Sequence, residues 1–367
     1  MGIRLVALND LHACVVFAPM VDIFGQLHFP FRSTMVKVLI SLSVLAASAT
    51  AGSVTELPES VTKLIDYSIN PCDDFYQYAC GAWHNDAVIP PDRHKIDTSF
   101  YKIYIENQAV LRKIFSDNTT KLGKFGEFYN SCLDTATLSS LGLTPLEDSF
   151  KAIRSASTKL DLLIVAAKLA KNGIPAFVDI NARAVENDWT KNTLFGIRWE
   201  YVEPVYKAYI ASVLQLAGYT AEQAEAAVPV LIRFEQTLAG VALSRLEEME
   251  AVVSPYTALT YSQLDQKYPL LVGSWLKGNG FNVRDEGGGS NDWVGFKDLT
   301  YFDKTEELLK DTTLDNLRTI VEYKLIHASS THLTPEFRTA NWNLFGKKIK
   351  GQKVEPSREK FCMSQTR

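Results

Sequence analysis

The sequence predicts a mainly α-helical fold: one large multi-helix domain with a single small β-hairpin region near residues 174–199. Three observations predict this fold. Apolar side chains recur every three to four residues through most of the chain, which is the period of a helix that buries one face. Cap residues precede these stretches, and Gly or Pro follows them. Residues 174–199 alone alternate β-branched and aromatic side chains around turn residues, as short strands do.

Six helices are expected before the β region, each from an apolar stripe and its flanking residues. Asp73 is the expected cap of the second helix, and Gly81 is expected to end it. Ser99 is the expected cap of the third, and Asn172 with Gly173 closes the last. In order, these helices cover residues 56–69, 74–81, 100–115, 124–134, 146–153 and 160–171.

After Pro204 the helical pattern resumes. Gly218 ends the first helix of this half, and Thr220 caps the next, which is expected to run to about Glu250 with Pro229 inside it. Shorter helices are expected at residues 260–264, 275–276, 301–310 and 314–326, and the last stretch reads as a helix from Glu336, a short linker and Cys362.

Composition and charge narrow the classes of function. The chain has 367 residues, of which 46% are hydrophobic, and a formal net charge of -4. That is a globular composition without the basic footprint of a nucleic-acid-binding protein. The densest basic run, residues 347–353, is interpreted as solvated surface.

Residues 35–51 have the pattern of a secretory signal peptide. A lysine precedes an apolar run, and Ala49-Thr50-Ala51 forms the expected cleavage site. The run is shorter than the about 20 residues of a membrane span, so secretion is expected rather than membrane anchoring. We interpret residues 1–34 as a gene-model extension ahead of a true start at Met35; the alternative is an amphipathic leader.

Two further features follow from secretion. Asn118-Thr119-Thr120 is an N-glycosylation sequon at a predicted helix end, so Asn118 is a candidate glycosylation site. Four cysteines remain after signal removal, and an oxidising compartment favours their pairing. Cys72 and Cys80, on one helix, would lie about 12 Å apart, beyond the reach of a disulfide. Either they pair with Cys132 and Cys362, or their partners lie outside this chain.

The sequence contains no recognisable active site. A zinc peptidase helix carries two histidines one turn apart with a glutamate between them. His327 and His332 are five residues apart, without an acidic residue between them, so they cannot easily face one ion. No catalytic residue, no metal ligand and no cofactor is therefore predicted for this chain.

Several blocks resemble one protein family. The opening stretch NPCDDFYQYACGAW, followed by IPPD, is similar to the opening signature of the neprilysin family of zinc metalloendopeptidases, which includes the endothelin-converting enzymes. KFGEFYNSCLD, TYSQLDQKYPLLVGSWL and the stretch EFRTANWNLFGKKIKGQK with Cys362 resemble later blocks of the same family. The resemblance extends from about Ser60 to the end of the chain.

The resemblance implies a part of a larger enzyme. Residues 52–367 would form the family's N-terminal helical domain, which caps the catalytic domain and restricts substrates to peptides. The zinc-binding half is absent here, so this chain alone is expected to be inactive, with the catalytic zinc domain and peptide substrates as its partners. Cys132 would bond Cys362, and Cys72 and Cys80 would bond cysteines of the catalytic half. The alternative is a secreted, non-catalytic helical module that binds peptides or proteins.

Overall fold

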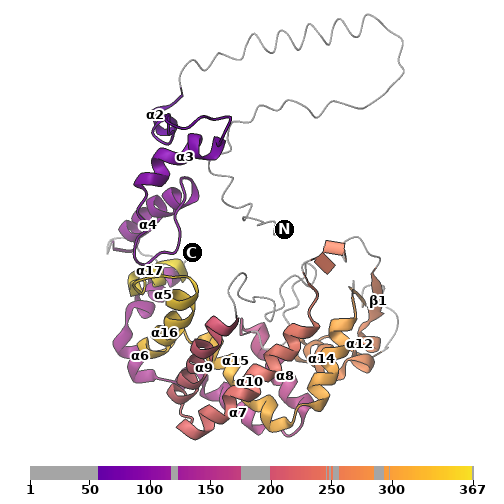
Figure 1. The fold of residues 1–367 in the computed structure, drawn as a ribbon. Helices are drawn as coiled ribbons and strands as arrows, with labels where there is room; N and C mark the ends of the chain where they lie inside the picture. Colours follow the sequence, from indigo (N-terminus) through magenta and orange to yellow (C-terminus); the bar gives the residue numbers. More distant parts are fainter. Residues whose placement is uncertain are drawn as a thin grey trace, which may run out of the picture. The chain divides into compact units, whose positions relative to one another are not determined.

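A computed structural model describes residues 57–116, 123–174, 199–244, 246–247, 249–250, 256–284, 293–296 and 298–365 (Figure 1). It confirms a mainly helical fold. The chain divides into two compact units, the first ending at Asp117 and the second beginning at Asn118. Residues expected to form one domain from 52 to 367 thus fall into two units. The expected signal peptide, the leader and Asn118 lie outside the described residues.

The first unit holds α2 (Glu59–Thr62), α3 (Phe75–Asp86) and α4 (Phe100–Ser116). The helix expected over residues 56–69 is reduced to α2. The chain turns after it because the Asp66 carboxylate accepts hydrogen bonds from the backbone and hydroxyl of Ser68. An Asx turn of this kind competes with helical bonding.

Two expectations about α3 were wrong. Its cap is Asp74, whose side chain accepts from the Gln77 N–H at 2.9 Å, and not Asp73. Gly81 does not end the helix, which continues to Asp86. A Cβ on Gly81 would lie 2.8 Å from the Cβ of Asp66, so glycine is required there by a close approach and not by a turn.

The second unit contains most of the helices. Within it, α5, α16 and α17 gather at one end, and α12, α14 and β1 at the other, with α7–α10 and α15 between them (Figure 1). Its helices are α5 Lys124–Leu133, α6 Thr135–Leu141, η1 Thr144–Leu146, α7 Glu147–Ser155, α8 Lys159–Lys171, α9 Trp199–Leu216, α10 Ala221–Val241, α12 Tyr261–Lys267, η3 Pro269–Gly273, α13 Ser274–Asn279, α14 Thr300–Asp311, α15 Leu314–Ser329, α16 Pro335–Trp342, η4 Asn343–Ile349 and α17 Arg358–Gln365.

Helix starts in this unit follow local capping chemistry. Thr220 and Thr260 each form a reciprocal capping box with the glutamine three residues on, which satisfies two N–H groups that the helix leaves unpaired. The expectation that α10 runs to about Glu250 was wrong, because it ends at Val241. Ser244 and Glu247 exchange cap hydrogen bonds of their own and so begin a new turn.

The described β structure is one antiparallel pair. β1 (Thr257–Thr260) pairs with β2 (Trp293–Phe296), with Thr257 opposite Phe296. The sequence did not indicate this pair because each strand has four residues and shows only a weak apolar alternation. The β region predicted near 174–199 falls almost wholly on residues 175–198, which are outside the described part of the chain.

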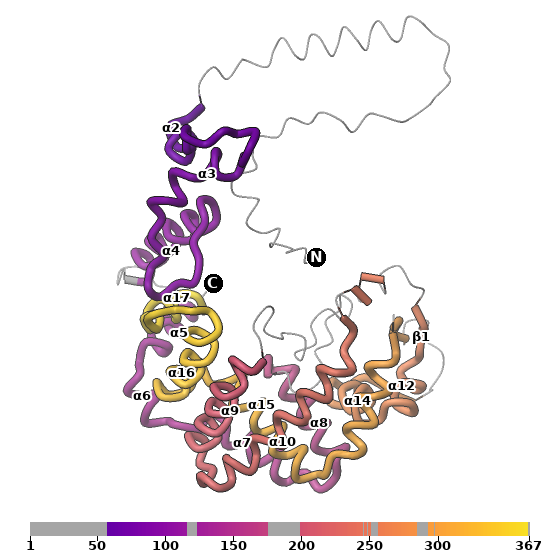
Figure 2. Tube along the Cα trace, viewed as in Figure 1, coloured from indigo at the N-terminus to yellow at the C-terminus, as the bar shows by residue number. Residues whose placement is uncertain are grey.

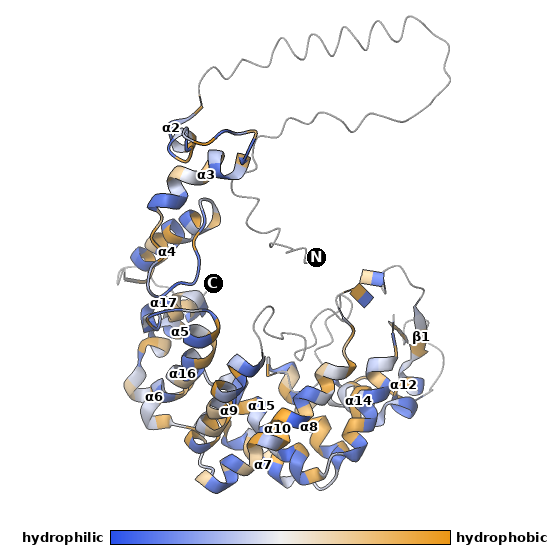
Figure 3. Cartoon of the chain, in the orientation of Figure 1, coloured by the Kyte–Doolittle hydropathy of each residue, from blue (hydrophilic) through white to orange (hydrophobic). Residues whose placement is uncertain are grey.

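The core of the second unit lies between its central helices. Leu162, Ile210, Leu231 and Leu317 come from α8, α9, α10 and α15 and have no exposed surface. Apolar and polar residues alternate along these helices, as expected for helices that bury one face (Figure 3). In the described residues, no helix combines the length and apolar character needed to cross a membrane.

Candidate functional site

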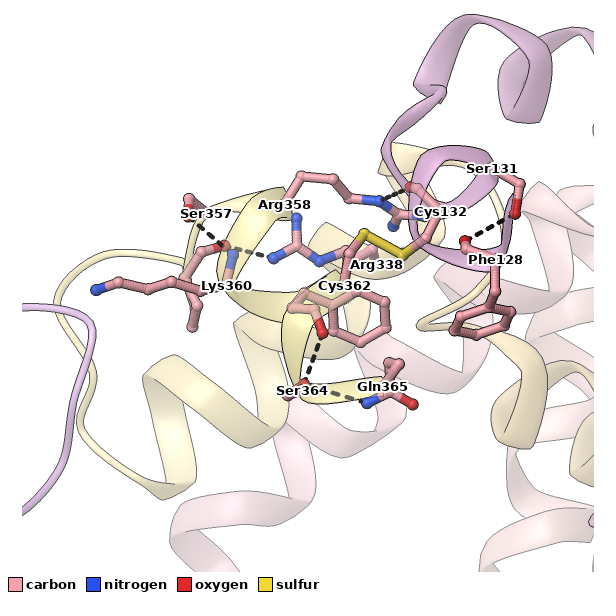
Figure 4. Close-up of a disulfide and its surroundings, with 12 residues drawn as sticks. Phe128, Ser131, Cys132, Arg338, Ser357, Arg358, Lys360, Cys362, Ser364 and Gln365 are labelled. Carbon is pink, nitrogen blue, oxygen red and sulfur yellow. Dashed lines mark hydrogen bonds between the residues drawn. A yellow bond between two sulfur atoms is a disulfide. The ribbon is translucent and has the colours of Figure 1, made fainter. Parts of the chain in front are cut away.

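The end of the second unit is clamped by a disulfide. Cys132 on α5 bonds Cys362 on α17, joining positions 230 residues apart in sequence, with their Cα atoms 5.7 Å apart (Figure 4). The tube in Figure 2 shows the same neighbourhood, with α17 lying against α5. This is the pairing that the family resemblance implied.

Arginines surround this disulfide. The Arg358 Nε donates to the Cys132 carbonyl at 2.7 Å (Figure 4). Arg338 forms an ion pair with Glu355 at 3.1 Å. Both guanidinium groups lie over the Phe361 ring, at 5.2 and 5.3 Å from its centroid. Burial, followed by the charge of Arg338, lowers the pKa of Arg358. The contacts fix the chain segment leading to Cys362 and do not form a reactive site.

The other two cysteines differ from each other. Cys72 is an exposed free thiol that precedes α3, so the expectation that it shares a helix with Cys80 was wrong. Cys80 is buried within α3 and takes part in a disulfide. This differs from the expectation that both cysteines wait for a partner outside the chain.

A buried polar cluster joins α9, α15 and η4. The Tyr209 hydroxyl lies 2.8 Å from His327 Nδ1, and the rings of Tyr209, Tyr323 and Phe345 lie within 5.8 Å of the imidazole. Desolvation, followed by the charge of Lys324, lowers the pKa of His327 to about 4. His327 is therefore a neutral structural residue at physiological pH.

A second part of the cluster reaches α10. The Tyr206 hydroxyl donates to Glu235 at 2.5 Å, and Lys324 donates to the other oxygen of the same carboxylate at 2.6 Å. Tyr323 donates to Tyr206 at 3.2 Å. Burial raises the pKa of Tyr206 and of Tyr323, so both stay protonated donors. The sequence signal was present, because Tyr206 and Tyr209 stand three residues apart on one face of α9, but spacing alone does not distinguish a buried polar pair from an apolar stripe.

A separate ion pair crosses the central helices. Glu322 has a side chain only 5% exposed and accepts two hydrogen bonds from Arg154, at 2.8 and 3.0 Å. The Tyr219 hydroxyl donates to the same carboxylate at 2.7 Å. The carboxylate thus links α7, α15 and the turn after α9.

The described residues do not supply a metal centre. Among them no group of three or more His, Cys, Asp or Glu side chains is placed to hold an ion. His327 bonds Tyr209, and His332 packs its ring 5.5 Å from that of Phe361. These side chains do not fit the zinc that the family resemblance implies for the catalytic half.

The first unit carries an exposed apolar surface. Val88 is 82% exposed and Phe100 74%, and large apolar side chains continue along α4 at Ile103, Val110 and Ile114. Large apolar side chains exposed at several positions of one helix are typical of an interaction site. In the second unit, a groove of about 680 Å³ between α9 and α10 is lined by Val228 and Ile232 and edged by charged side chains.

Comparisons with known proteins agree with this architecture. Residues 71–367 match the model of peptidase family M13. Endothelin-converting enzyme-like 1 of Rattus norvegicus is 26% identical over 335 residues, which is 82% of this chain and 42% of that protein. An endothelin-converting enzyme homolog of Locusta migratoria is 33% identical over 115 residues, covering 30% of this chain and 14% of that protein.

The fold also matches a solved structure. The zinc metalloprotease Zmp1 of Mycobacterium tuberculosis, in complex with an inhibitor, superposes with a TM-score of 0.69 at 18% identity, covering 84% of this chain and 50% of that one. The chain covers 42% of the length of the endothelin-converting enzyme-like 1 proteins of Rattus norvegicus and Mus musculus. Since the family model covers most of the sequence and the helical fold agrees, the chain belongs to peptidase family M13.

Proposed function

We propose that this chain is the N-terminal, substrate-restricting part of a secreted neprilysin-like zinc metalloendopeptidase that cleaves peptides. The observation that carries the proposal is the family match over residues 71–367, in a chain that covers only 42% of its relatives' length. The rest of such an enzyme would hold the zinc and perform the chemistry. The role of the present chain would be to cover that site and limit access to it.

The exposed apolar surface of the first unit supports a docking role. Side chains such as Val88 and Phe100 gain free energy when a partner removes them from water, at roughly 25 cal/mol per Å² of apolar area. We propose that they contact the catalytic zinc domain. Cys72, an exposed thiol in the same unit, would bond a cysteine of that domain, and its exposure supports this proposal.

Activity measurements and the downstream nucleotide sequence test this proposal. The purified chain should not hydrolyse fluorogenic peptides, with or without added zinc; chelator-sensitive hydrolysis would contradict the assignment of the chemistry to another part. The nucleotide sequence after the Arg367 codon should encode an HExxH helix in the same frame. Co-expression of that region with this chain should restore chelator-sensitive activity, and activity of the downstream region alone on long polypeptides would show what the present chain restricts.

The groove between α9 and α10 favours a second candidate, a secreted non-catalytic module that binds peptides. Its volume of about 680 Å³ lies within the range of ligand pockets, and Arg233 and Lys207 stand at its edge. A transcript that ends at Arg367, a monodisperse product and saturable binding of peptides that Ile232→Lys abolishes would favour this alternative. Aggregation of the isolated chain would instead favour the proposal that it is the N-terminal part of a larger peptidase.

A further inference from the structure

Two helices of the second unit, η3 and the longer η4, are π-helices. η4 continues α16 without a break, but it is a π-helix over seven residues, Asn343–Ile349. At its end the Lys350 N–H donates to the Phe345 carbonyl, five residues back, at 3.2 Å. π-helices are rare and recur at functional positions, and the surrounding structure must favour them over the α-helix.

The inner side of η4 is held by the buried polar cluster. Leu344 is 1% exposed, and the Phe345 ring lies 5.7 Å from Tyr209 and 5.5 Å from His327. Asn341, just before η4, donates to Ser330 at 3.0 Å. These contacts fix the first half of η4 on α9 and α15.

The outer side is held by an indole. The Trp342 ring lies over Gly346, where a Cβ would come within 2.1 Å of it, so only glycine fits. The Trp342 Nε1 donates to Gln352 at 3.0 Å, and the Gln352 N–H donates to the Gly346 carbonyl at 3.0 Å. These two hydrogen bonds connect η4 to the segment that follows it.

The segment after η4 is anchored at two further points. Glu355 bonds Arg338 and Thr339 of α16, at 3.1 and 3.0 Å. Cys362 is then tied to Cys132 on α5. The number of residues wound into η4 therefore determines which residues of the exit segment, 350–365, reach these anchors.

We infer that the π winding of η4 determines the position at which the exit segment crosses α16 and contacts α5. Through η4, that position is coupled to the cluster around His327. If η4 rewound as an α-helix, every later residue would advance along the helix by a fraction of a turn, and Gln352 and Glu355 would leave their partners.

Amide hydrogen exchange of the full chain tests the contact between Trp342 and Gln352. Gln352→Ala removes the acceptor of Trp342, so exchange over residues 343–352 should rise roughly fivefold, the usual effect of one lost hydrogen bond. Gln352→Glu keeps an acceptor at this position and should leave exchange near that of the unmodified chain. Equal exchange in all three proteins would overturn the inference.

Two single-residue deletions distinguish an effect of the winding of η4 from an effect of the length of the chain before Cys362. Deleting Lys347 makes the bond from Lys350 to Phe345 a four-residue, α-helical one; deleting Lys353 shortens the exit segment by the same amount outside η4. Both residues are exposed and carry one positive charge. The Lys347 deletion should strongly reduce the yield of the linked Cys132–Cys362 peptide, while the Lys353 deletion should retain most of it. The same yield from both deletions would overturn the inference.

Discussion

At the scale of single residues, the second unit is stabilised by polar side chains that are buried and paired. His327 has the largest consequence, because its pKa falls from 6.5 to about 4 on burial. Besides burial, two charges act on it: Lys324 lowers the pKa, and Glu235 raises it. When folding lowers the pKa of a histidine, its contribution to stability is fully present at pH values above the pKa that the histidine has in the unfolded chain. That contribution is lost as the pH falls towards the pKa of the folded state.

The unfolding free energy should therefore fall by about 3 kcal/mol between pH 6.5 and pH 4 through His327 alone. Denaturant unfolding at several pH values measures this loss. His327→Gln should flatten the pH dependence over this window, although it lowers stability at pH 7 through lost packing. His84→Gln, at an exposed position, is the control and should keep the full slope. A slope that survives in His327→Gln would refute the assignment.

The ion pair of Arg154 with Glu322 gives a second prediction. Arg154→Met leaves the buried carboxylate without its charged partner and should reduce the unfolding free energy by about 2 to 3 kcal/mol. Glu322→Leu with Arg154→Met should cost less than the sum of the two single changes, because both ends of the pair are then removed. Additive losses in this double-mutant cycle would show that the two side chains do not interact.

At the scale of elements, the starts of helices followed from the sequence better than their ends. Thr220 caps α10 as expected, because a cap acts on neighbouring N–H groups. Helix α4 begins directly after Ser99, but the expectation that Ser99 caps it was wrong: the Asp97 carboxylate accepts from the Tyr101 N–H at 2.9 Å. Gly81 was misread as a stop, since the close approach of Asp66 that requires it is a tertiary contact. The pairing of β1 with β2 and the winding of η4 depend likewise on contacts between residues far apart in sequence.

The disulfide between α5 and α17 gives a prediction at this scale. A closed loop of this length stabilises the folded state by about 5 kcal/mol in the chain-entropy model. Cys132→Ser with Cys362→Ser should lower the unfolding free energy by up to that amount and loosen the whole second unit. Peptide mapping without reduction should find Cys132 linked to Cys362. A link between Cys80 and Cys132 would contradict the structure.

At the scale of the whole molecule, the family and the helical fold could be predicted from the sequence, whereas the candidate site could be predicted only in part. The Cys132–Cys362 pairing came from the family resemblance, because spacing alone left the pairings open. The cluster around His327 was missed, since its residues come from four helices that are far apart in sequence. The division at Asp117 was missed as well.

The exposed surface of the first unit predicts the behaviour of the isolated chain. Val88 and Phe100 should drive self-association of the isolated chain, in which the proposed partner domain does not cover them. Val88→Asp with Phe100→Asp should shift the chain towards monomer in light scattering. Val354→Asp, at an exposed apolar position of the second unit, is the matched control and should change little. Self-association that persists in the double variant would show that residues other than Val88 and Phe100 cause it.

The long reach of the disulfide also has a consequence for biosynthesis. Cys132 leaves the ribosome 230 residues before Cys362, an interval of roughly 10 to 50 s at ordinary rates of synthesis. During that time Cys72, Cys80 and Cys132 are all present in the proposed oxidising compartment, and the correct partner of Cys132 is not. Native pairing therefore depends on early folding of α3 and α5, or on an isomerase that reverses premature bonds. Maturation of this protein should respond to the supply of disulfide isomerase more than to the supply of oxidant.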